Sequence, residues 1–310
     1  MKIISLFSGA GGLDLGLVLA NNEIVWANDI DKDAVATYKK NIGSDIVCGD
    51  INDVDLSTVP EADVVVGGFP CQGFSVANMK RSVDDGRNQL YKFFLRMVVE
   101  KRPKYFIAEN VRGILNLGKG EVISAIVSDF ENAGYLVTVN LVNMADYGVP
   151  QTRRRVIILG QRKDLGGEMR LVVPPKTNSD KSSEGLPEWV SIKDAIGHFP
   201  EPGEDCGIPN HVASSYKVSF RNFIGHRHTD PDKPSPTILA RGNGKGGVVA
   251  IPHYNGERRL TVRESATIQT FPEDFVFVGR MNSCYRQIGN AVPVKFAKML
   301  GEELKSLENK

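Results

Sequence analysis

A cysteine in a loop rich in glycine and proline is the most reactive side chain that the sequence offers. Cys71 lies in the segment GGFPCQGFS (residues 67–75), directly after the apolar run of residues 64–67. A thiolate in such a loop can act as a nucleophile when nearby cations or a helix N-terminus lower its pKa. A lone cysteine is more often an inert buried side chain, so Cys71 by itself does not establish a reactive centre.

An acid and two arginines follow later in the sequence, at strand ends that are expected to lie at the same edge of the sheet as Cys71. Glu109 ends the apolar run of residues 105–108, and a carboxyl group there can exchange a proton with a substrate ring, although a plain surface acid is the alternative. Gln151, Arg153 and Arg155 alternate at the start of a later strand, which predicts one shared face with Arg154 opposite. Two guanidinium groups beside a thiol and a carboxyl group favour a thiolate and can hold an anion such as phosphate.

Three glycines mark a second kind of site near the N-terminus. Gly9, Gly11 and Gly12 follow the first apolar run and precede a helical pattern. Glycine allows a sharp turn there and lets a ligand approach the unpaired N–H groups at the start of the helix. The spacing is not GxGxxG, so this loop alone is weak evidence and a simple tight turn remains the alternative.

The next two strand ends carry carboxylates with apolar neighbours. Asp29 ends the second predicted strand, where an acid can accept hydrogen bonds from ribose hydroxyls, and Asp50 follows the third, where it can face an adenine amino group. Ile30 and Ile51 stand next to these acids and can hold a purine between them. Each aspartate could instead cap a helix or turn. Three such features at three successive strand ends nevertheless predict a nucleoside cofactor.

The elements that must position these residues are short strands that alternate with helices. We expect strands at residues 2–7, 24–27, 45–48, 64–67, 105–108, 135–140 and 156–160, and helices at 12–19, from 31, near 88–101 and at 120–132. This alternation predicts a doubly wound, mostly parallel α/β sheet. Such sheets bind ligands at the carboxyl ends of their strands, which would bring all of the candidate residues to one crevice.

The regular alternation stops after residue 164. Residues 165–260 are rich in Gly, Pro, Ser and Asn, which predicts a smaller loop-rich domain with strands at 238–240 and 248–251; helices are expected at 262–270 and 294–304. Residues 216–263 hold nine Lys or Arg and three acids, whereas residues 1–66 hold eleven acids and four lysines. The basic stretch is expected either to contact a polyanion or to be a solvated surface.

Composition narrows the class of protein. The 310 residues carry a net charge of +1, and 41% are hydrophobic, which excludes a disordered polyelectrolyte. The sequence shows no apolar run of the roughly 20 residues that cross a membrane and no signal-peptide layout. The four cysteines form no CxxC pair, and His226, His228 and His253 are poorly spaced as ligands, so we expect no metal and a reducing, cytoplasmic location.

Taken in order, the motifs resemble those of bacterial DNA (cytosine-5)-methyltransferases of the restriction–modification type. The matching segments are residues 7–12 (FSGAGG), 70–72 (PCQ), 109–111 (ENV), 151–155 (QTRRR), 263–272 and 287–292 (QIGNAV). They span nearly the whole chain outside residues 165–235. In well-known members the second strand ends in Glu and an aromatic residue, whereas Asp29 and Ile30 stand here.

The resemblance implies a fold, a cofactor and a reaction. The fold is that of class I S-adenosylmethionine-dependent methyltransferases, with residues 1–164 and 287–310 as the catalytic domain and 165–286 as the target-recognition domain and hinge. Cys71 attacks C6 of a cytosine flipped out of double-stranded DNA, Glu109 stabilises the ring, and C5 receives the methyl group. The resemblance further implies that Arg153 and Arg155 position the base or its phosphate, and that Gln151 supports them.

Family similarity assigns the remaining contacts. Cofactor residues are Phe7, Gly9, Gly11, Gly12, Asp29, Ile30, Asp50, Ile51 and Asn290, and residues expected at the base or DNA are Pro70, Gln72, Ser75, Arg227, Arg241 and Lys245. We expect a monomer that needs no membrane and that can share its DNA site with a restriction endonuclease. Three alternatives remain: a tRNA cytosine-5 methyltransferase, whose Cys-Phe-Thr tripeptide is missing, a catalytically silent nucleic-acid-binding module, and a nicotinamide oxidoreductase.

Overall fold

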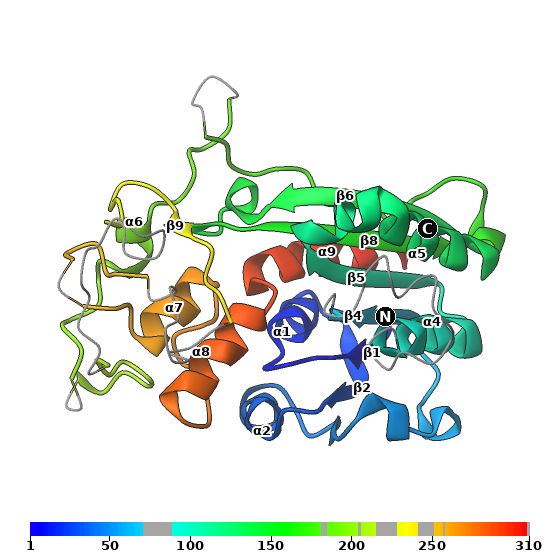
Figure 1. The fold of residues 1–310 in the computed structure, drawn as a ribbon, viewed down its shortest axis with the longest axis horizontal. Coiled ribbons are helices and arrows are strands. Elements are labelled where there is room, and N and C mark those ends of the chain that lie inside the picture. The colour runs from blue at the N-terminus through cyan, green and yellow to red at the C-terminus, as the bar shows by residue number, and fades with distance from the viewer. Residues whose placement is uncertain are drawn as a thin grey trace.

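A computed structural model describes residues 1–70, 89–180, 185–203, 206–214, 228–240, 251–256 and 258–308. Within these ranges the chain forms a seven-stranded sheet with helices on both faces, and a smaller lobe of short helices and loops lies beside it (Figure 1). Six residues with expected roles lie outside the described ranges, namely Cys71, Gln72, Ser75, Arg227, Arg241 and Lys245.

The large sheet is doubly wound, as predicted. Its strand order is β3-β2-β1-β4-β5-β8-β6, and β8 alone runs antiparallel to the others. The strands are β1 (Lys2–Leu6), β2 (Glu23–Asp29), β3 (Ile46–Cys48), β4 (Val64–Gly67), β5 (Tyr105–Val111), β6 (Tyr135–Asn143) and β8 (Arg154–Arg162). The reversed direction of β8 places its first residues next to the last residues of β5, at the carboxyl edge of the parallel strands.

Helices cover both faces because the strands alternate their buried side chains. Val65 packs into the core beneath α4 (Gln89–Lys101) and α5 (Glu121–Asn132), whereas Val64 and Val66 pack toward α1 (Gly12–Leu19) and α9 (Val294–Leu307). The helix α2 (Lys32–Asn41) covers β2 and β3 through Val35 and Tyr38. Short 3-10 turns are η1 (Ile51–Asp53), η2 (Leu56–Thr58), η3 (Arg112–Leu115), η4 (Leu117–Gly120), η5 (Met144–Tyr147) and η6 (Lys163–Leu165).

The C-terminal helix α9 returns to the first lobe and packs on α1. A Cβ atom added at Gly16 would lie 2.4 Å from Ala297 Cβ and 2.6 Å from Val294 O, so the two helices are in direct backbone contact. Leu171, which follows the domain boundary expected at residue 164, is buried in the same core. The segment after β8 therefore folds back over the sheet before it enters the second lobe.

In its described residues, the second lobe contains three short helices. They are α6 (Ile192–Ile196), α7 (Val262–Ile268) and α8 (Met281–Asn290), and their apolar side chains form a core that also includes Ala10 and Ala291 of the first lobe. Figure 1 shows α8 beside α1, at the junction between the lobes. Neither α6 nor α8 was expected, since five residues are too few for a periodic signal and α8 mixes small, polar and aromatic residues.

Two expected strands differ in the structure. The strand expected to carry residues 151–155 is interrupted: β7 (Gln151–Thr152) pairs with β9 (Ser235–Pro236) in a separate two-stranded sheet, Arg153 follows, and β8 begins at Arg154. Residues 238–240 form no strand, because the backbone N–H of Ile238 donates to the Gln151 side chain (2.8 Å) rather than to a neighbouring strand. Residues 248–250 lie outside the described ranges.

Candidate active site at the carboxyl edge of the sheet

One cavity of about 590 Å³ joins the two groups of residues that the sequence analysis singled out. Its walls are the loops after β1, β2, β3 and β4, the end of β5, the beginning of β8 and the end of α8. Phe7, Asp29 and Asp50 line one part, and Pro70, Glu109 and Arg155 line another. The volume lies within the range of roughly 300–1,000 Å³ typical of sites for small ligands and cofactors.

The glycine loop after β1 turns through left-handed backbone conformations. Phe7, Gly9 and Gly11 have φ angles of 55°, 58° and 86°, and this strained turn directs backbone N–H groups toward the neighbouring strand end. Gly9 N donates to Asp29 Oδ2 (2.8 Å). Gly9 and Gly12 line the cavity. A Cβ atom at Gly11 would meet Tyr38, so its small size serves packing against α2, and its expected contact with the cofactor stays a prediction.

The two aspartates expected at the cofactor combine a local structural role with a place in the cavity wall. Asp29 Oδ1 accepts from Asp31 N (2.8 Å), and Asp50 Oδ1 accepts from Asn52 N (3.0 Å) as the cap of η1. Burial raises the pKa of Asp29 above its usual value. Because each carboxylate oxygen can accept more than one hydrogen bond, these bonds fix both acids while leaving capacity for ligand hydroxyl or amino groups.

Apolar side chains and the end of α8 complete this part of the cavity. Ile51 is 3% exposed, whereas Ile30 is 68% exposed, and both line the cavity. Both side chains thus offer apolar surface to the cavity, and the expected placement of a purine between them stays a prediction. Asn290, the last residue of α8, lies on the same wall.

Glu109 and Arg155 form a half-buried ion pair in the other part of the cavity. Arg155 Nε lies 2.8 Å from Glu109 Oε1, and the side chains are 11% and 12% exposed. They meet because β5 and β8 are antiparallel: Val111 pairs with Arg155, so Glu109 is its diagonal neighbour on one face. Among the described residues, no donor makes a well-aligned hydrogen bond to Glu109 Oε1. This oxygen is buried against the Arg155 guanidinium, which fixes the orientation of the carboxyl group.

The loop before Cys71 is held by Asn110. Asn110 Nδ2 donates to Phe69 O (2.9 Å), and the Phe69 ring packs against Tyr91 and Phe94 of α4. Gly68 lies against Glu109, since an added Cβ atom would be 3.3 Å from Glu109 Oε2. The chain therefore leaves the described region at Pro70 directly beside the Glu109–Arg155 pair. Asn110 belongs to the ENV motif, but its neighbours along the sequence gave no indication of this contact.

Arg153 lies in the wall of the cavity, but its terminal nitrogens are engaged elsewhere. Nη1 donates to Ile238 O (2.9 Å), and Nη2 donates to Gly289 O (2.9 Å) and Ala291 O (3.0 Å). Burial is the main reason that its pKa falls to about 9. Backbone carbonyls of the second lobe, of α8 and of the segment after it thus hold both terminal nitrogens, while Nε makes no hydrogen bond among the described residues. The expected contact of Arg153 with the base or its phosphate stays a prediction.

Gln151 belongs to the same buried junction. Its Nε2 donates to Gln269 Oε1 (2.9 Å), and Gln269 Nε2 donates to Ile288 O (2.8 Å). Gly289 packs directly on residues 239 and 240, because a Cβ atom there would lie 2.2 Å from Ala240 N. The prediction that Gln151 and Arg153 share an orientation with Arg155 is therefore wrong in part: the first two point into the junction between lobes, and only Arg155 pairs with Glu109.

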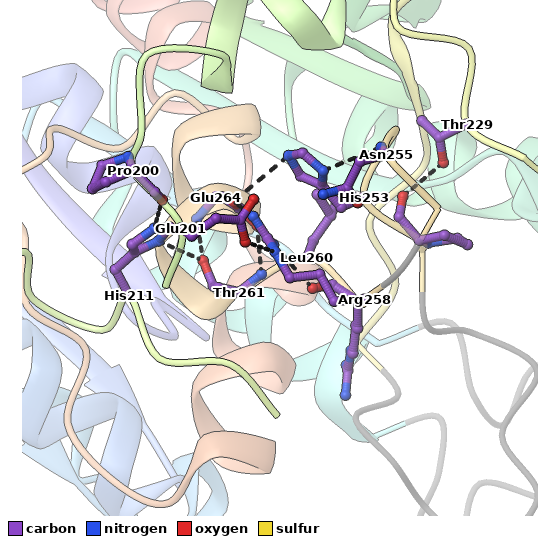
Figure 2. Close-up of polar contacts among 12 residues, drawn as sticks. Pro200, Glu201, His211, Thr229, His253, Asn255, Arg258, Leu260, Thr261 and Glu264 are labelled. Carbon is purple, nitrogen blue, oxygen red and sulfur yellow. Dashed lines mark hydrogen bonds and ion pairs between the residues drawn. The ribbon is translucent and has the colours of Figure 1, made fainter. Parts of the chain in front are cut away.

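Three arginines of the basic stretch 216–263 point into the second lobe. From the sequence, this stretch is expected either to contact a polyanion or to be a solvated surface, and neither alternative includes buried arginines. Figure 2 shows Arg258 against Glu264, with both carboxylate oxygens of Glu264 accepting from its Nη1 and Nη2 (2.9 and 2.8 Å). Arg259 stacks over the Tyr285 ring at 3.6 Å from its centroid. Arg263 is fully buried and donates to the carbonyls of Pro209 and Pro272. These charges stabilise the lobe and are not available to DNA phosphates.

The same cluster contains two buried histidines. His211 Nε2 lies 2.8 Å from Pro200 O, which can only accept, so this nitrogen carries the proton and Nδ1 accepts from the Thr261 hydroxyl (3.0 Å) (Figure 2). His253 Nε2 lies 3.9 Å from Glu264 Oε1. In the part of the chain that the structure describes, no three His, Cys, Asp or Glu side chains gather as metal ligands. No described helix is long and apolar enough to cross a membrane.

Sequence reasoning missed one buried acid near the cavity, Asp14. It is the one charged residue of the otherwise apolar helix α1, and a lone acid in such a helix is the signal that could have found it. Asp14 is fully buried, and its two oxygens accept from the hydroxyls of Ser5 (2.7 Å) and Tyr38 (2.8 Å).

Comparison with known proteins identifies the relatives of this chain. The sequence pattern of the family described as C-5 cytosine-specific DNA methylase matches residues 1–306. The type II methyltransferase M.NgoFVII of Neisseria gonorrhoeae is 40% identical over 94% of this chain and 83% of its own. M.BsuRI of Bacillus subtilis is 35% identical over 98% of this chain and 79% of its own.

Solved structures agree with the fold. A protein assigned as a DNA modification methyltransferase encoded within an E. coli prophage superposes with a TM-score of 0.76 at 26% identity, over 100% of both chains. The Dnmt2 methyltransferase of S. pombe superposes with a TM-score of 0.74 at 21% identity over 99% of both chains, which concerns the fold alone.

Proposed function

The chain belongs to the family of C-5 cytosine-specific DNA methylases, and from this premise we propose how its own residues perform the reaction. It transfers a methyl group to C5 of cytosine in DNA, as a type II methyltransferase of restriction–modification. Because C5 cannot be reached inside a duplex, the target base is flipped into the part of the cavity that Pro70, Glu109 and Arg155 line.

We assign the nucleophile to Cys71, which follows Pro70 and lies outside the described residues. Its thiolate adds to C6 of cytosine, so a C–S bond forms and electron density moves to C5. Glu109 holds a proton at N3 and accepts from the exocyclic amine, which stabilises the ring during this addition. After C5 has received the methyl group, loss of the C5 proton and cleavage of the C–S bond release 5-methylcytosine. Gln72 and Ser75 are proposed to help close this loop over the base.

The arginines have separate tasks in this proposal. Arg155 fixes the Glu109 carboxyl group at 2.8 Å and keeps further N–H groups for the base. Arg153 positions the site through the carbonyls of Ile238, Gly289 and Ala291, to which its guanidinium donates. Gln151 supports it by accepting from the backbone N–H of Ile238.

The cavity fits S-adenosylmethionine as the methyl donor. Asp29 and Asp50 keep free acceptor capacity for hydroxyl and amino groups, and Ile30 and Ile51 offer apolar surfaces for a purine. Gly9 leaves open space beside the start of α1, and Gly12 lines the cavity while its Cα packs against Val292 O. When bound, this cofactor supplies an activated methyl group on a sulfonium. Phe7 and Asn290 complete the proposed contacts on the cavity wall. The reaction uses no metal in this proposal.

Recognition of the DNA sequence is assigned to residues 165–286, with residues 1–164 and 287–310 as the catalytic domain. Arg227, Arg241 and Lys245 lie outside the described residues and are proposed to contact phosphates and base edges. We further propose a monomer that acts on DNA in the bacterial cytoplasm, beside a restriction endonuclease that cuts the same site and forms no stable complex with it.

The single observation that carries the proposal is the shared cavity, in which the Glu109–Arg155 pair and the Asp29–Asp50 end meet. The test is to express the chain in cells that lack cytosine methylation and to sequence their DNA after bisulfite treatment. Methylated cytosines should occur in one short sequence context. Purified chain should also methylate duplex DNA and leave tRNA unmodified, and the opposite preference would replace DNA by tRNA as the substrate.

A variant identifies the nucleophile. Cys71→Ser should abolish methylation while cofactor affinity, measured by calorimetry, stays close to that of the unmodified chain. The unmodified chain should form a covalent complex with duplex DNA that contains 5-fluorocytosine, and Cys71→Ser should not. Substantial turnover by Cys71→Ser would refute the assignment.

A further inference from the structure

Asp14 is a charged group that the reaction described above does not use. It lies in the first turn of α1, directly after the glycine loop, and is fully buried. Ser5 of β1 and Tyr38 of α2 donate their hydroxyls to its two oxygens (2.7 and 2.8 Å). Two hydroxyl donors and the positive end of a helix favour the ionised form of the carboxyl group in this geometry.

No described lysine or arginine forms an ion pair with Asp14, so its charge is not compensated locally. Burial raises its pKa to about 6, against the opposing effect of the Ser5 and Tyr38 hydrogen bonds. The carboxylate is therefore ionised at neutral pH at the expense of folding stability. Buried charges of this kind occur mainly where a ligand or a reaction uses them.

The charges around it make one end of the cavity negative. Asp29 lies close enough to Asp14 to raise its pKa further, and it has no described ion pair either. Asp31 is neutralised by Arg286 at 2.7 Å. At the opposite end, Glu109 is neutralised by Arg155, and Arg153 is engaged with carbonyls. The negative charge is thus confined to the cofactor end of the cavity, beside the glycine loop.

We propose that Asp14 is a specificity-determining residue: its buried carboxylate biases the cofactor pocket toward the positively charged methyl donor and against the uncharged sulfide product. This inference rests on S-adenosylmethionine being the cofactor. When the S–CH₃ bond breaks, its electron pair stays on sulfur, so the sulfonium charge disappears while the adenosine and amino-acid groups remain. Charge at sulfur is hence a property by which a pocket can distinguish donor from product. A fixed carboxylate in a poorly solvated wall attracts the sulfonium of the donor and gains nothing from the uncharged sulfide of the product.

Asp14 acts at the wall and touches no reacting atom, so it is distinct from the ribose and adenine contacts proposed for Asp29 and Asp50. Its bonds to Ser5 and Tyr38 fix the carboxylate beneath the loop that holds Gly9 and Gly12. Gly11 rests on the same Tyr38 ring, which prevents the acid and the loop from moving apart.

The test is a binding comparison with three ligands of the same shape. Dissociation constants are measured by calorimetry for S-adenosylmethionine and sinefungin, which carry a positive charge at or near the sulfur position, and for S-adenosylhomocysteine, which does not. The key quantity is the ratio of the constant for S-adenosylhomocysteine to that for sinefungin. Asp14→Asn should lower this ratio by about three- to tenfold, the size expected for charges that interact across a partly buried site.

Two further measurements separate charge from structure. In the unmodified chain the ratio should fall as pH decreases from 7.5 to 5.5, because Asp14 becomes protonated. In Asp14→Asn the fall should be clearly smaller, because Asp29, whose pKa burial also raises, is then the remaining uncompensated acid of the two. Tyr38→Phe removes one hydrogen bond but keeps the carboxylate, so it should shift the pH at which the ratio falls to a higher value and retain discrimination at pH 8.5. Thermal unfolding of each variant verifies that the fold is intact.

The outcomes are distinguishable. If all three ligands bind and Asp14→Asn leaves the ratio and its pH dependence unchanged, the inference is wrong while the proposed function stands. If none of the three binds to the unmodified chain, the proposed cofactor and with it this inference fail together.

Discussion

Glu109 and Arg155 show how two ordinary residues become a reactive pair through the direction of one strand. They are separated by 46 positions, but antiparallel pairing of β5 with β8 sets their side chains 2.8 Å apart on one face. Their mutual neutralisation permits both to remain half buried beside the substrate pocket. Glu109 Oε1 is buried against the Arg155 guanidinium, so the ion pair fixes the orientation of the carboxyl group in the cavity wall.

We predict that Glu109→Gln and Arg155→Lys each reduce methylation by about 10²- to 10⁴-fold, because both disturb proton placement at the ring. Glutamine keeps the shape but cannot hold the proton, and lysine keeps the charge but loses the planar fork. Single-turnover rates with radioactive donor provide the measurement. The double variant should lose far less than the product of the two effects, since the residues act as a unit. Fully multiplicative losses would contradict a functional pair.

Asp14 yields a prediction on stability that is independent of any ligand. Its pKa of about 6 in the folded chain exceeds the ordinary value of 3.8, so its protonated form stabilises the fold below about pH 4. That contribution is lost as pH rises through 6 and amounts to about 3 kcal/mol. Asp14→Asn should therefore gain stability relative to the unmodified chain between pH 4 and pH 7. Urea unfolding across this range is the measurement, and a pH-independent difference would contradict the burial of the charge.

At the scale of elements, the contact between α1 and α9 depends on glycine. Gly16 allows the backbones of the two helices to touch, and Asn22 Nδ2 donates to Gly301 O (3.2 Å) at the far end of the same contact. This packing holds the first turn of α1, with its glycine loop, against the segment that follows α8. The helix that ends the described chain thereby supports the site at the beginning of the chain.

Gly16→Ala should destabilise the chain by about 1–3 kcal/mol, because the added methyl group meets backbone atoms of α9 that cannot rotate away. Intrinsic helix propensity favours alanine by about 1 kcal/mol, so the expected sign is opposite to that of an exposed helix position. Gly43→Ala is the matched control, since nothing lies within 4 Å of its Cβ position. Chemical unfolding should separate the two; equal effects would show that the helices do not pack closely.

For the whole molecule, the junction between lobes joins the proposed catalytic and recognition functions. Arg153 connects the start of β8 to Ile238, which lies beyond β9, and to Gly289 and Ala291 next to the cavity. The second lobe also binds part of its own positive charge internally. Arg258, Arg259 and Arg263 contact a carboxylate, an aromatic ring and backbone carbonyls within the lobe. Contacts with DNA phosphates must therefore come from other cations.

This division predicts different salt dependence for two arginines. Arg241→Gln should reduce the slope of the logarithm of DNA affinity against the logarithm of salt concentration by about 0.9, the value for one phosphate contact. Arg258→Gln should leave that slope unchanged and instead lower stability by about 3 kcal/mol, because Glu264 loses its partner. Fluorescence anisotropy at several salt concentrations measures the slope. A reduced slope in folded Arg258→Gln protein would show that this residue faces DNA.

Local signals in the sequence were enough to predict the sheet, most of its strands and helices, and the strand ends that form the cavity. Apolar periodicity and turn residues specify each element, and parallel topology brings the carboxyl ends of strands together without further information. The match of ordered motifs identified the family, which the relatives confirm.

Only the tertiary structure decided which charged side chains line the cavity and which are buried in hydrogen bonds and ion pairs within the protein. Gln151, Arg153 and Arg155 alternate identically in the sequence, yet the first two are turned into the junction by a break between β7 and β8. The structural roles of Arg258, Arg263 and Asp14 depend on hydrogen-bond and ion-pair partners that no local sequence pattern predicts. The physical reason is that a buried charge is fixed by hydrogen-bond partners from distant segments, and those partners exist only once the chain has folded.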